Sequence, residues 1–227
     1  MGKGSVLALA REGVDLVVSA RGEERLLRVC KEISNETGAM ITPVVADHST
    51  EEGREKILSK CPEPDILVGT CAPPIFTGDF RKVSDEEWME TLTVALLSPV
   101  NFMKATVDGM CKRGWGRVVN IGTGAAKFPA EVRILSGPPR AALVNYTVAV
   151  AKKVAKHGVS INNILPGMHI TDPIIEKYNI FIEKLGTTPT VFLATLWLLL
   201  KSKLKELYII GITFQKDGYY TSYKTKE

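Results

Sequence analysis

The chain has 227 residues, 45% of them apolar, and a formal net charge of only +4 at pH 7. This length suits one domain with an ample hydrophobic core. The charge comes from 29 basic and 25 acidic residues that are interspersed along the sequence. Such a mild balance gives no indication of a nucleic-acid partner and is typical of solvated, charged faces.

The cysteines, the histidines and the lengths of the apolar runs argue against a metalloprotein, a membrane protein and a secreted protein. The four cysteines are scattered without metal-type spacing, and we interpret them as reduced thiols of a cytoplasmic protein. The three histidines show no helical pairing, so no metal site is expected. The longest apolar run, Val191 to Leu200, is about half a membrane span and predicts a buried helix. No secretory signal and no membrane partner are expected.

Short β-rich runs alternate with longer helical patterns along the chain. The sequence predicts strands at Asp15–Ser19, Met40–Ala46, Ile66–Gly69, Arg117–Ile121, Ser160–Leu165 and Leu207–Ile210. It predicts helices at Lys3–Arg11, Glu23–Glu36, Glu51–Ser59, Asp85–Lys112, Arg140–Lys156 and Thr190–Lys201. Continuous Val/Ile/Leu strands are typical of a parallel sheet covered by helices on both faces. We therefore predict an α/β fold with one doubly wound, Rossmann-like parallel sheet, forming a single domain over residues 1–227.

Individual helix boundaries have local signals. Ser84 followed by three carboxylates predicts a capped helix start. Pro138 and Pro139 are compatible with the first turn of a helix, where proline costs least. Pro99 lies inside the pattern of Asp85–Lys112 and should kink or split that helix.

Three motifs, in their order and spacing, carry a family resemblance: Asp65-Ile66-Leu67-Val68, Trp115 to Ile121, and Ile161 to Gly167. With the late pair Asp217-Gly218, they resemble the landmarks of the short-chain dehydrogenase/reductase superfamily. Within this superfamily, the sequence most resembles the carrier-protein 3-oxoacyl reductases. The resemblance runs from residue 2 to about residue 220 and implies an oxidoreductase that uses a nicotinamide dinucleotide.

At the amino terminus, the resemblance places Gly2 at the last glycine of the family's phosphate-binding turn. The family's first strand then has no counterpart in this sequence, which leaves a gap in the sheet or forces its neighbours together. The alternative is a sequence that begins downstream of that strand. Gly2-Lys3-Gly4 alone is a weak phosphate signal.

Two residues after the early strands bear on the cofactor. Arg21 stands where relatives that use NAD place a carboxylate, and a cation there suits the 2′-phosphate of NADP. NADP is therefore expected, with NAD possible; a solvated arginine is the alternative. Asp47 matches the family's adenine-contacting aspartate, and a helix cap is its alternative.

The expected catalytic positions depart from the family pattern. The family's tyrosine and lysine correspond to Ser136 and Arg140, and its serine corresponds to Thr123. Serine is a far weaker acid than tyrosine, whose pKa is about 10. We expect Ser136 to cap a helix, with proton transfer by Ser136 or an ordered water as the alternative. Arg140 is expected to contact the cofactor ribose, and Thr123 to orient a carbonyl or end a strand. Ala95 replaces the family's relay asparagine.

The remaining expected cofactor contacts come from loops. Ala72 ends the segment that replaces the family's Asn-Asn-Ala-Gly, whereas Pro166, Gly167 and Thr171 match the family's contacts near the nicotinamide. Between Asp172 and Lys184 the substrate lid is shortened. The resemblance therefore implies a small carbonyl or alcohol substrate.

Two functions remain open. One is an oxidoreductase of doubtful catalytic competence, assembled as a homo-oligomer through its two long helices. The other is a non-catalytic, self-associating descendant of the family.

Overall fold

The computed structural model describes residues 1–71 and 79–167. Residues 1–167 belong to one compact unit and residues 168–227 to a second. The predicted helix Thr190–Lys201 and the predicted strand Leu207–Ile210 lie outside the described residues. The single-domain organisation stays a prediction.

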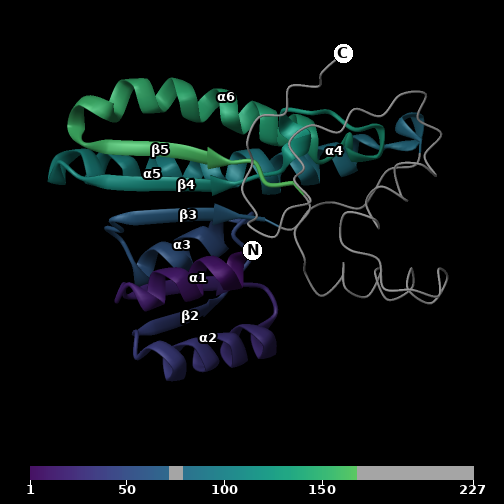
Figure 1. Ribbon diagram of the computed structural model, residues 1–227. Helices are drawn as coiled ribbons and strands as arrows, with labels where there is room; N and C mark the ends of the chain where they lie inside the picture. The colour runs from purple at the N-terminus through teal and green to yellow at the C-terminus, as the bar shows by residue number, and fades with distance from the viewer. Residues whose placement is uncertain (72–78, 168–227) are drawn as a thin grey trace, which may run out of the picture. The chain divides into compact units, whose positions relative to one another are not determined.

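Strands and helices alternate as the sequence predicts (Figure 1). The strands are β1 (Leu16–Ala20), β2 (Ile41–Val45), β3 (Ile66–Thr70), β4 (Gly116–Ile121) and β5 (Val159–Ile164). The α-helices are α1 (Gly2–Arg11), α2 (Glu23–Thr37), α3 (Glu51–Lys60), α4 (Asp85–Leu92), α5 (Ser98–Arg113) and α6 (Gly137–Val154). Five short helical turns join them: η1 (Phe80–Lys82), η2 (Thr93–Leu97), η3 (Gly124–Ala126), η4 (Glu131–Arg133) and η5 (Ala155–His157).

All described strand pairs are parallel, which confirms the predicted α/β class. The strands form two sheets instead of one continuous ladder: β1 pairs with β2, and β3, β4 and β5 pair in that order. No strand among the described residues lies between β1 and β3. Of the two expected consequences of a missing first strand, the chain therefore shows the gap.

The packing follows this division. One core cluster gathers α5, α6, β4 and β5 around fully buried Met110 and Val118. A second, smaller cluster gathers α1 and α2 over β1 and β2 around Ala10 and Ile33. A domain of this size usually has one contiguous core. Here, each sheet has its own.

Pro99 divides the long helical pattern of Asp85–Lys112, as expected. Proline lacks the N–H that would bond to the carbonyl four residues earlier, and its ring crowds that carbonyl, which belongs to Ala95. The chain responds with a π-helical turn, η2, in which the N–H of Ser98 donates to the carbonyl of Thr93. The helix therefore becomes α4, η2 and α5.

The predicted helix starts are confirmed. The hydroxyl of Ser84 accepts from the N–H of Glu87, whose carboxylate accepts from the N–H of Ser84, forming a capping box at α4. Pro138 and Pro139 occupy the first turn of α6. That helix begins at Gly137, three residues before the predicted start, because both prolines are already helical.

We predict that replacing Gly158 destabilises the fold far more than replacing Gly38. Both glycines have φ of 75°, a left-handed conformation that costs other residues about 1–2 kcal/mol. A methyl group on Gly158 would also collide with the carbonyl of Gly114, whereas nothing lies within 4 Å of one on Gly38. Gly158→Ala should lower the free energy of unfolding by about 3–4 kcal/mol, and Gly38→Ala by about 1 kcal/mol. Urea denaturation measures both, and equal losses would contradict the packing at Gly158.

Candidate functional site

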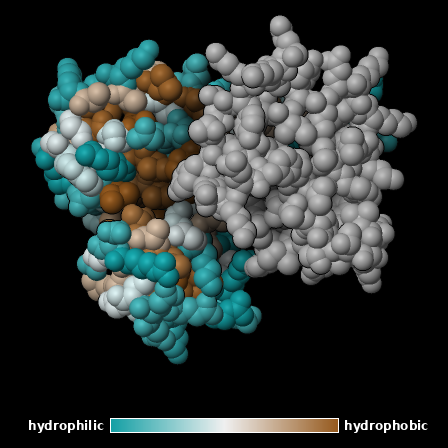
Figure 2. Space-filling model, viewed as in Figure 1, coloured by the Kyte–Doolittle hydropathy of each residue, from teal (hydrophilic) through white to brown (hydrophobic). Residues whose placement is uncertain are grey.

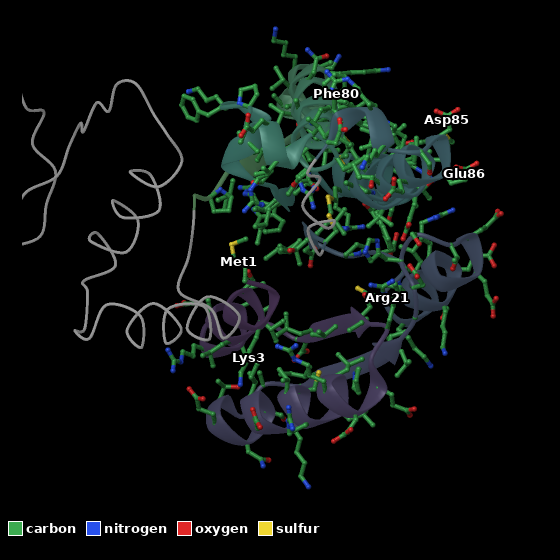
Figure 3. The ribbon with its side chains drawn as sticks, turned by 90° about the vertical axis from the view of Figure 1, so that its right-hand side faces the viewer. Met1, Lys3, Arg21, Phe80, Asp85 and Glu86 are labelled. Carbon is green, nitrogen blue, oxygen red and sulfur yellow. The ribbon has the colours of Figure 1, made fainter. Side chains whose placement is uncertain are left out.

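The expected site residues follow the carboxyl ends of parallel strands, where open α/β sheets bind ligands. Arg21 follows β1, Asp47 follows β2, Thr123 follows β4, and Pro166 follows β5. Figure 3 looks onto the edge toward which the arrows of β3, β4 and β5 point in Figure 1, and shows Met1 and Arg21 on this side. The α/β topology therefore brings residues far apart in sequence to one edge.

The centre of the site is a buried cluster formed by Ser136, Arg140 and Cys71. Arg140 is only 4% exposed, and its Nη1 donates to both the carbonyl and the hydroxyl oxygen of Ser136, each at 3.1 Å. Its Nη2 donates to Sγ of Cys71 at 3.0 Å. All four cysteines are free thiols. The guanidinium thus ties the start of α6 to the end of β3.

The structure corrects the prediction that Ser136 caps a helix. Ser136 precedes α6 but has helical dihedral angles, and its side chain makes no capping hydrogen bond. The residues whose N–H groups would donate to such a cap are Pro138 and Pro139 in the first turn of α6, and proline has no N–H. The hydroxyl accepts from Arg140 instead. Thr123 does serve as a turn residue, since its Oγ1 accepts from the N–H of Ala125 at 3.4 Å. A role for Thr123 in orienting a carbonyl stays a prediction.

Close backbone packing holds these segments together. The N–H of Gly124 donates to the carbonyl of Pro166 at 2.8 Å, which joins the loops after β4 and β5. A side chain on Gly137 would lie 2.8 Å from the carbonyl oxygen of Ala125. The start of α6 therefore packs directly against η3, and only glycine allows this approach.

Arg21 and Asp47 form a second group at the ends of β1 and β2. Nη1 of Arg21 lies 3.8 Å from a carboxylate oxygen of Asp47, and the Arg21 side chain is 71% exposed. Asp47 accepts from the hydroxyl and the N–H of Ser49, which hold the pKa of its carboxyl below the usual range. Thr50, and not Asp47, caps α3. One carboxylate oxygen of Asp47 thus already has partners.

His48 contacts Ser98, and no sequence motif indicates this link. Nδ1 of His48 lies 2.7 Å from the hydroxyl of Ser98, which donates to the carbonyl of His48 at 2.7 Å. Because a hydroxyl has one hydrogen, Nδ1 is then the donor to it. Burial is the main cause that lowers the pKa of His48. This contact connects the loop after β2 to the start of α5.

Asn120 carries an unusual buried amide. It lies on β4, 4% exposed, opposite Gly69 of β3. Its Nδ2 has no hydrogen-bond partner among the residues that the structure describes. A side chain on Gly69 would lie 2.8 Å from Oδ1 of Asn120, so the glycine makes room for this amide. An unsatisfied buried donor costs about 1–3 kcal/mol.

Two expected cofactor contacts, Ala72 and Thr171, lie outside the described residues. Gly2, the predicted phosphate-binding glycine, is the first residue of α1. A side chain at this position would lie 3.6 Å from Cγ2 of Thr70. The N-terminus of α1 thus lies beside the carboxyl end of β3.

Comparison with known proteins gives a family match and several relatives. A family model described as short chain dehydrogenase matches residues 1–178. The uncharacterized oxidoreductase YvaG of Bacillus subtilis is 26% identical over 181 residues, covering 79% of this chain and 68% of that protein. The acetoacetyl-CoA reductase of Cupriavidus necator is 32% identical over 147 residues, covering 63% of this chain and 58% of that protein. The chain therefore spans about two thirds of the first of these relatives and less of the second.

Solved structures share the fold. The L-sorbose reductase from Gluconobacter frateurii, complexed with NADPH and L-sorbose, matches with a TM-score of 0.72 at 24% identity. The match covers 80% of this chain and 71% of that protein.

We predict that the fold loses stability as the pH falls because of His48. Its lowered pKa means that the unfolded chain binds a proton more readily than the folded chain. Stability should therefore fall as the pH drops below the unfolded pKa of about 6.5. The lowered pKa of Asp47 affects the stability of the fold only at a more acidic pH, near and below 3.8.

The test compares urea midpoints between about pH 8 and about pH 5 for the unaltered chain, His48→Asn and His157→Asn. His157 is exposed and provides the matched control. The pH dependence should shrink only in His48→Asn. An unchanged dependence in that variant would contradict this account.

Proposed function

The chain belongs to the short-chain dehydrogenase family, and from this premise we propose that it binds NADP at the carboxyl edge of its strands and acts weakly on a carbonyl or alcohol. The observation that carries the proposal is the Ser136–Arg140 pair at the start of α6. It keeps a buried cation at the position of the family's lysine and lacks the acid that the reaction needs.

The part of the site near α1 and Arg21 suits the adenosine and phosphate groups of the dinucleotide. The first turn of α1 offers backbone N–H groups at Gly2 and Lys3, which have no intrahelical acceptor. No atom of the described residues lies within 4 Å of a side chain placed on Gly4, so they leave the approach open there. Arg21 is exposed and close to Asp47, where a cation favours a 2′-phosphate. These features support NADP over NAD.

The part of the site around Ser136 and Arg140 does not suit the proton transfer that the family's reaction requires. A bound nicotinamide would supply or accept a hydride, and the protein must move the accompanying proton. The hydroxyl of Ser136 already accepts from Arg140, and the guanidinium cannot act as an acid near neutral pH. Arg140 also donates to Cys71, so its guanidinium is partly committed to structural contacts. We therefore infer that cofactor binding persists while proton transfer is slow.

Self-association is the second candidate function. Apolar side chains of Met89, Leu97 and Val148 are 57%, 45% and 48% exposed on α4, η2 and α6. They support a homo-oligomer built through these helices. Analytical ultracentrifugation of Val148→Glu tests this candidate, because a buried carboxylate would dissociate such an assembly.

Location remains a prediction of the sequence. Among the described residues, no helix has the length and apolarity to span a bilayer. A cytoplasmic site of action is part of our proposal.

We predict that Arg21→Ala weakens NADPH binding by about fivefold and leaves NADH binding unchanged, because only NADPH carries the 2′-phosphate. Arg25→Ala, an exposed arginine on α2, is the matched control. Nicotinamide fluorescence measures both affinities. If neither NADPH nor NADH binds the unaltered chain, the proposed function is wrong.

We also predict that Ser136→Tyr combined with Arg140→Lys introduces carbonyl reduction by NADPH. A tyrosine beside a lysine restores a proton donor, and such donors contribute about 100-fold or more to the rate. Oxidation of NADPH with a panel of ketones is the measurement, and Ser136→Phe with Arg140→Lys is the control without a hydroxyl. A double variant that binds NADPH without turnover would show that the relay pair is not what limits catalysis.

A further inference from the structure

The two groups of site residues belong to different sheets. Arg21 and Asp47 follow the strands of the first sheet, β1 and β2. Ser136 and Arg140 lie at the start of α6, which packs against β5 of the second sheet, β3 to β5. Among the described residues, no ladder joins the two sheets. A ligand that reaches both groups therefore depends on other contacts to hold the sheets at a fixed separation.

The loop after β2 is fixed to the first sheet by its own hydrogen bonds. The carboxylate of Asp47 accepts from the N–H and the hydroxyl of Ser49 at 2.9 and 2.6 Å. The hydroxyl of Thr50 donates to the carbonyl of Asp47 at 3.0 Å, and Arg54 donates to the carbonyl of Ser49 at 2.8 Å. These local bonds place Asp47 beside Arg21 without any group from the second sheet.

One residue of this loop reaches the helices of the second sheet. Nδ1 of His48 donates to the hydroxyl of Ser98, and that hydroxyl donates to the carbonyl of His48, both at 2.7 Å. Two reciprocal hydrogen bonds constrain the direction of the contact as well as its length. Among the described residues, no other hydrogen bond and no ion pair joins residues 1–60 to residues 66–167.

Ser98 is firmly attached to the second sheet. It is 1% exposed and is the first residue of α5. Helices α5 and α6 share the buried cluster around Met110, and η2, which directly precedes Ser98, packs against α6. Because Ser136 and Arg140 lie at the start of α6, the contact of His48 with Ser98 constrains where they lie relative to the loop after β2.

The remaining contacts between the sheets are less directional. Gly2 of α1 lies beside a methyl carbon of Thr70 at the end of β3. Figure 2 shows apolar surface over the sheet that contains β3. Hydrophobic contact is non-directional, so surfaces of this kind can shift against each other at little cost. The hydrogen bonds between His48 and Ser98 supply the directional constraint.

We propose that His48 and Ser98 are positioning residues for the cofactor, which hold the two sheets at the separation that lets one dinucleotide reach Arg21 and Arg140 together. The inference rests on the proposed function. A ligand with two contact points gains from the second only when both are held at the matching distance. Loss of the His48–Ser98 pair should therefore weaken a ligand that spans both sheets and spare a ligand that contacts only the first.

The test compares NADPH with adenosine 2′,5′-bisphosphate, which carries the 2′-phosphate and lacks the nicotinamide. Isothermal titration calorimetry of the full chain measures both affinities. Ser98→Ala removes both bonds of the pair. It should weaken NADPH binding by about tenfold and change bisphosphate binding by less than about twofold.

Thr106→Val is the matched control, because it also removes a buried hydroxyl from α5. That hydroxyl donates to the carbonyl of Phe102 within the same helix and makes no link between the sheets. Both affinities should stay unchanged in this variant.

Variants of His48 separate the hydrogen bond from packing. His48→Asn keeps a side-chain N–H close to the position of Nδ1 and should bind NADPH as the unaltered chain does. His48→Leu fills similar space without a donor and should bind NADPH about threefold more weakly. If Ser98→Ala does not fold, this pair of variants still decides the question.

Three results would overturn the inference. Equal weakening of both ligands by Ser98→Ala would show that the pair shapes the first sheet alone. Unchanged NADPH binding would show that the pair does not set the separation of the sheets. Equal affinities in His48→Leu and His48→Asn would assign the effect to packing. By contrast, an unaltered chain that binds neither ligand would refute the proposed function itself, and this inference with it.

Discussion

A strand of a parallel sheet is stable when hydrogen bonds cover both its edges and side chains cover both its faces. β4 is paired on both edges, with β3 on one side and β5 on the other, and its residues alternate between buried and partly buried. β1 and β3 differ, since neither pairs on its inner edge with any strand of the described residues. The site at the carboxyl ends of the strands is divided by the same break. Arg21 and Asp47 lie on one part, and Ser136 and Arg140 on the other.

This division has different consequences for binding and for catalysis. Binding a dinucleotide needs backbone N–H groups, a cation and close approach, and the described edge offers these at Gly2, Arg21 and Gly4. Catalysis needs an acid whose pKa matches the working pH. The Ser136–Arg140 pair has no such acid, and its hydrogen bonds hold the end of β3 against α6. In the described structure, Ser136 and Arg140 thus hold segments together.

The sequence predicted the described strands and helices well, because their periodicity and caps are local. It also predicted the break at Pro99, although not the form of the break, a π-helical turn in which the N–H of Ser98 donates to the carbonyl of Thr93. It failed where a side chain had a partner distant in the chain. His48, for example, meets Ser98 across fifty residues. The missing cap at Ser136 has a local cause, since Pro138 and Pro139 have no N–H to donate to it. Cys71 could have been noticed as a thiol directly after β3. Its pairing with Arg140 could not.

The central claim is that the break between β1 and β3 leaves two cores that are only weakly coupled. Hydrogen-exchange mass spectrometry across a urea titration tests it most directly, because it reports the unfolding midpoint of each region separately. The account predicts a lower midpoint for residues 2–45 than for residues 116–164. A single midpoint shared by both regions would show one cooperative core, and would contradict the account.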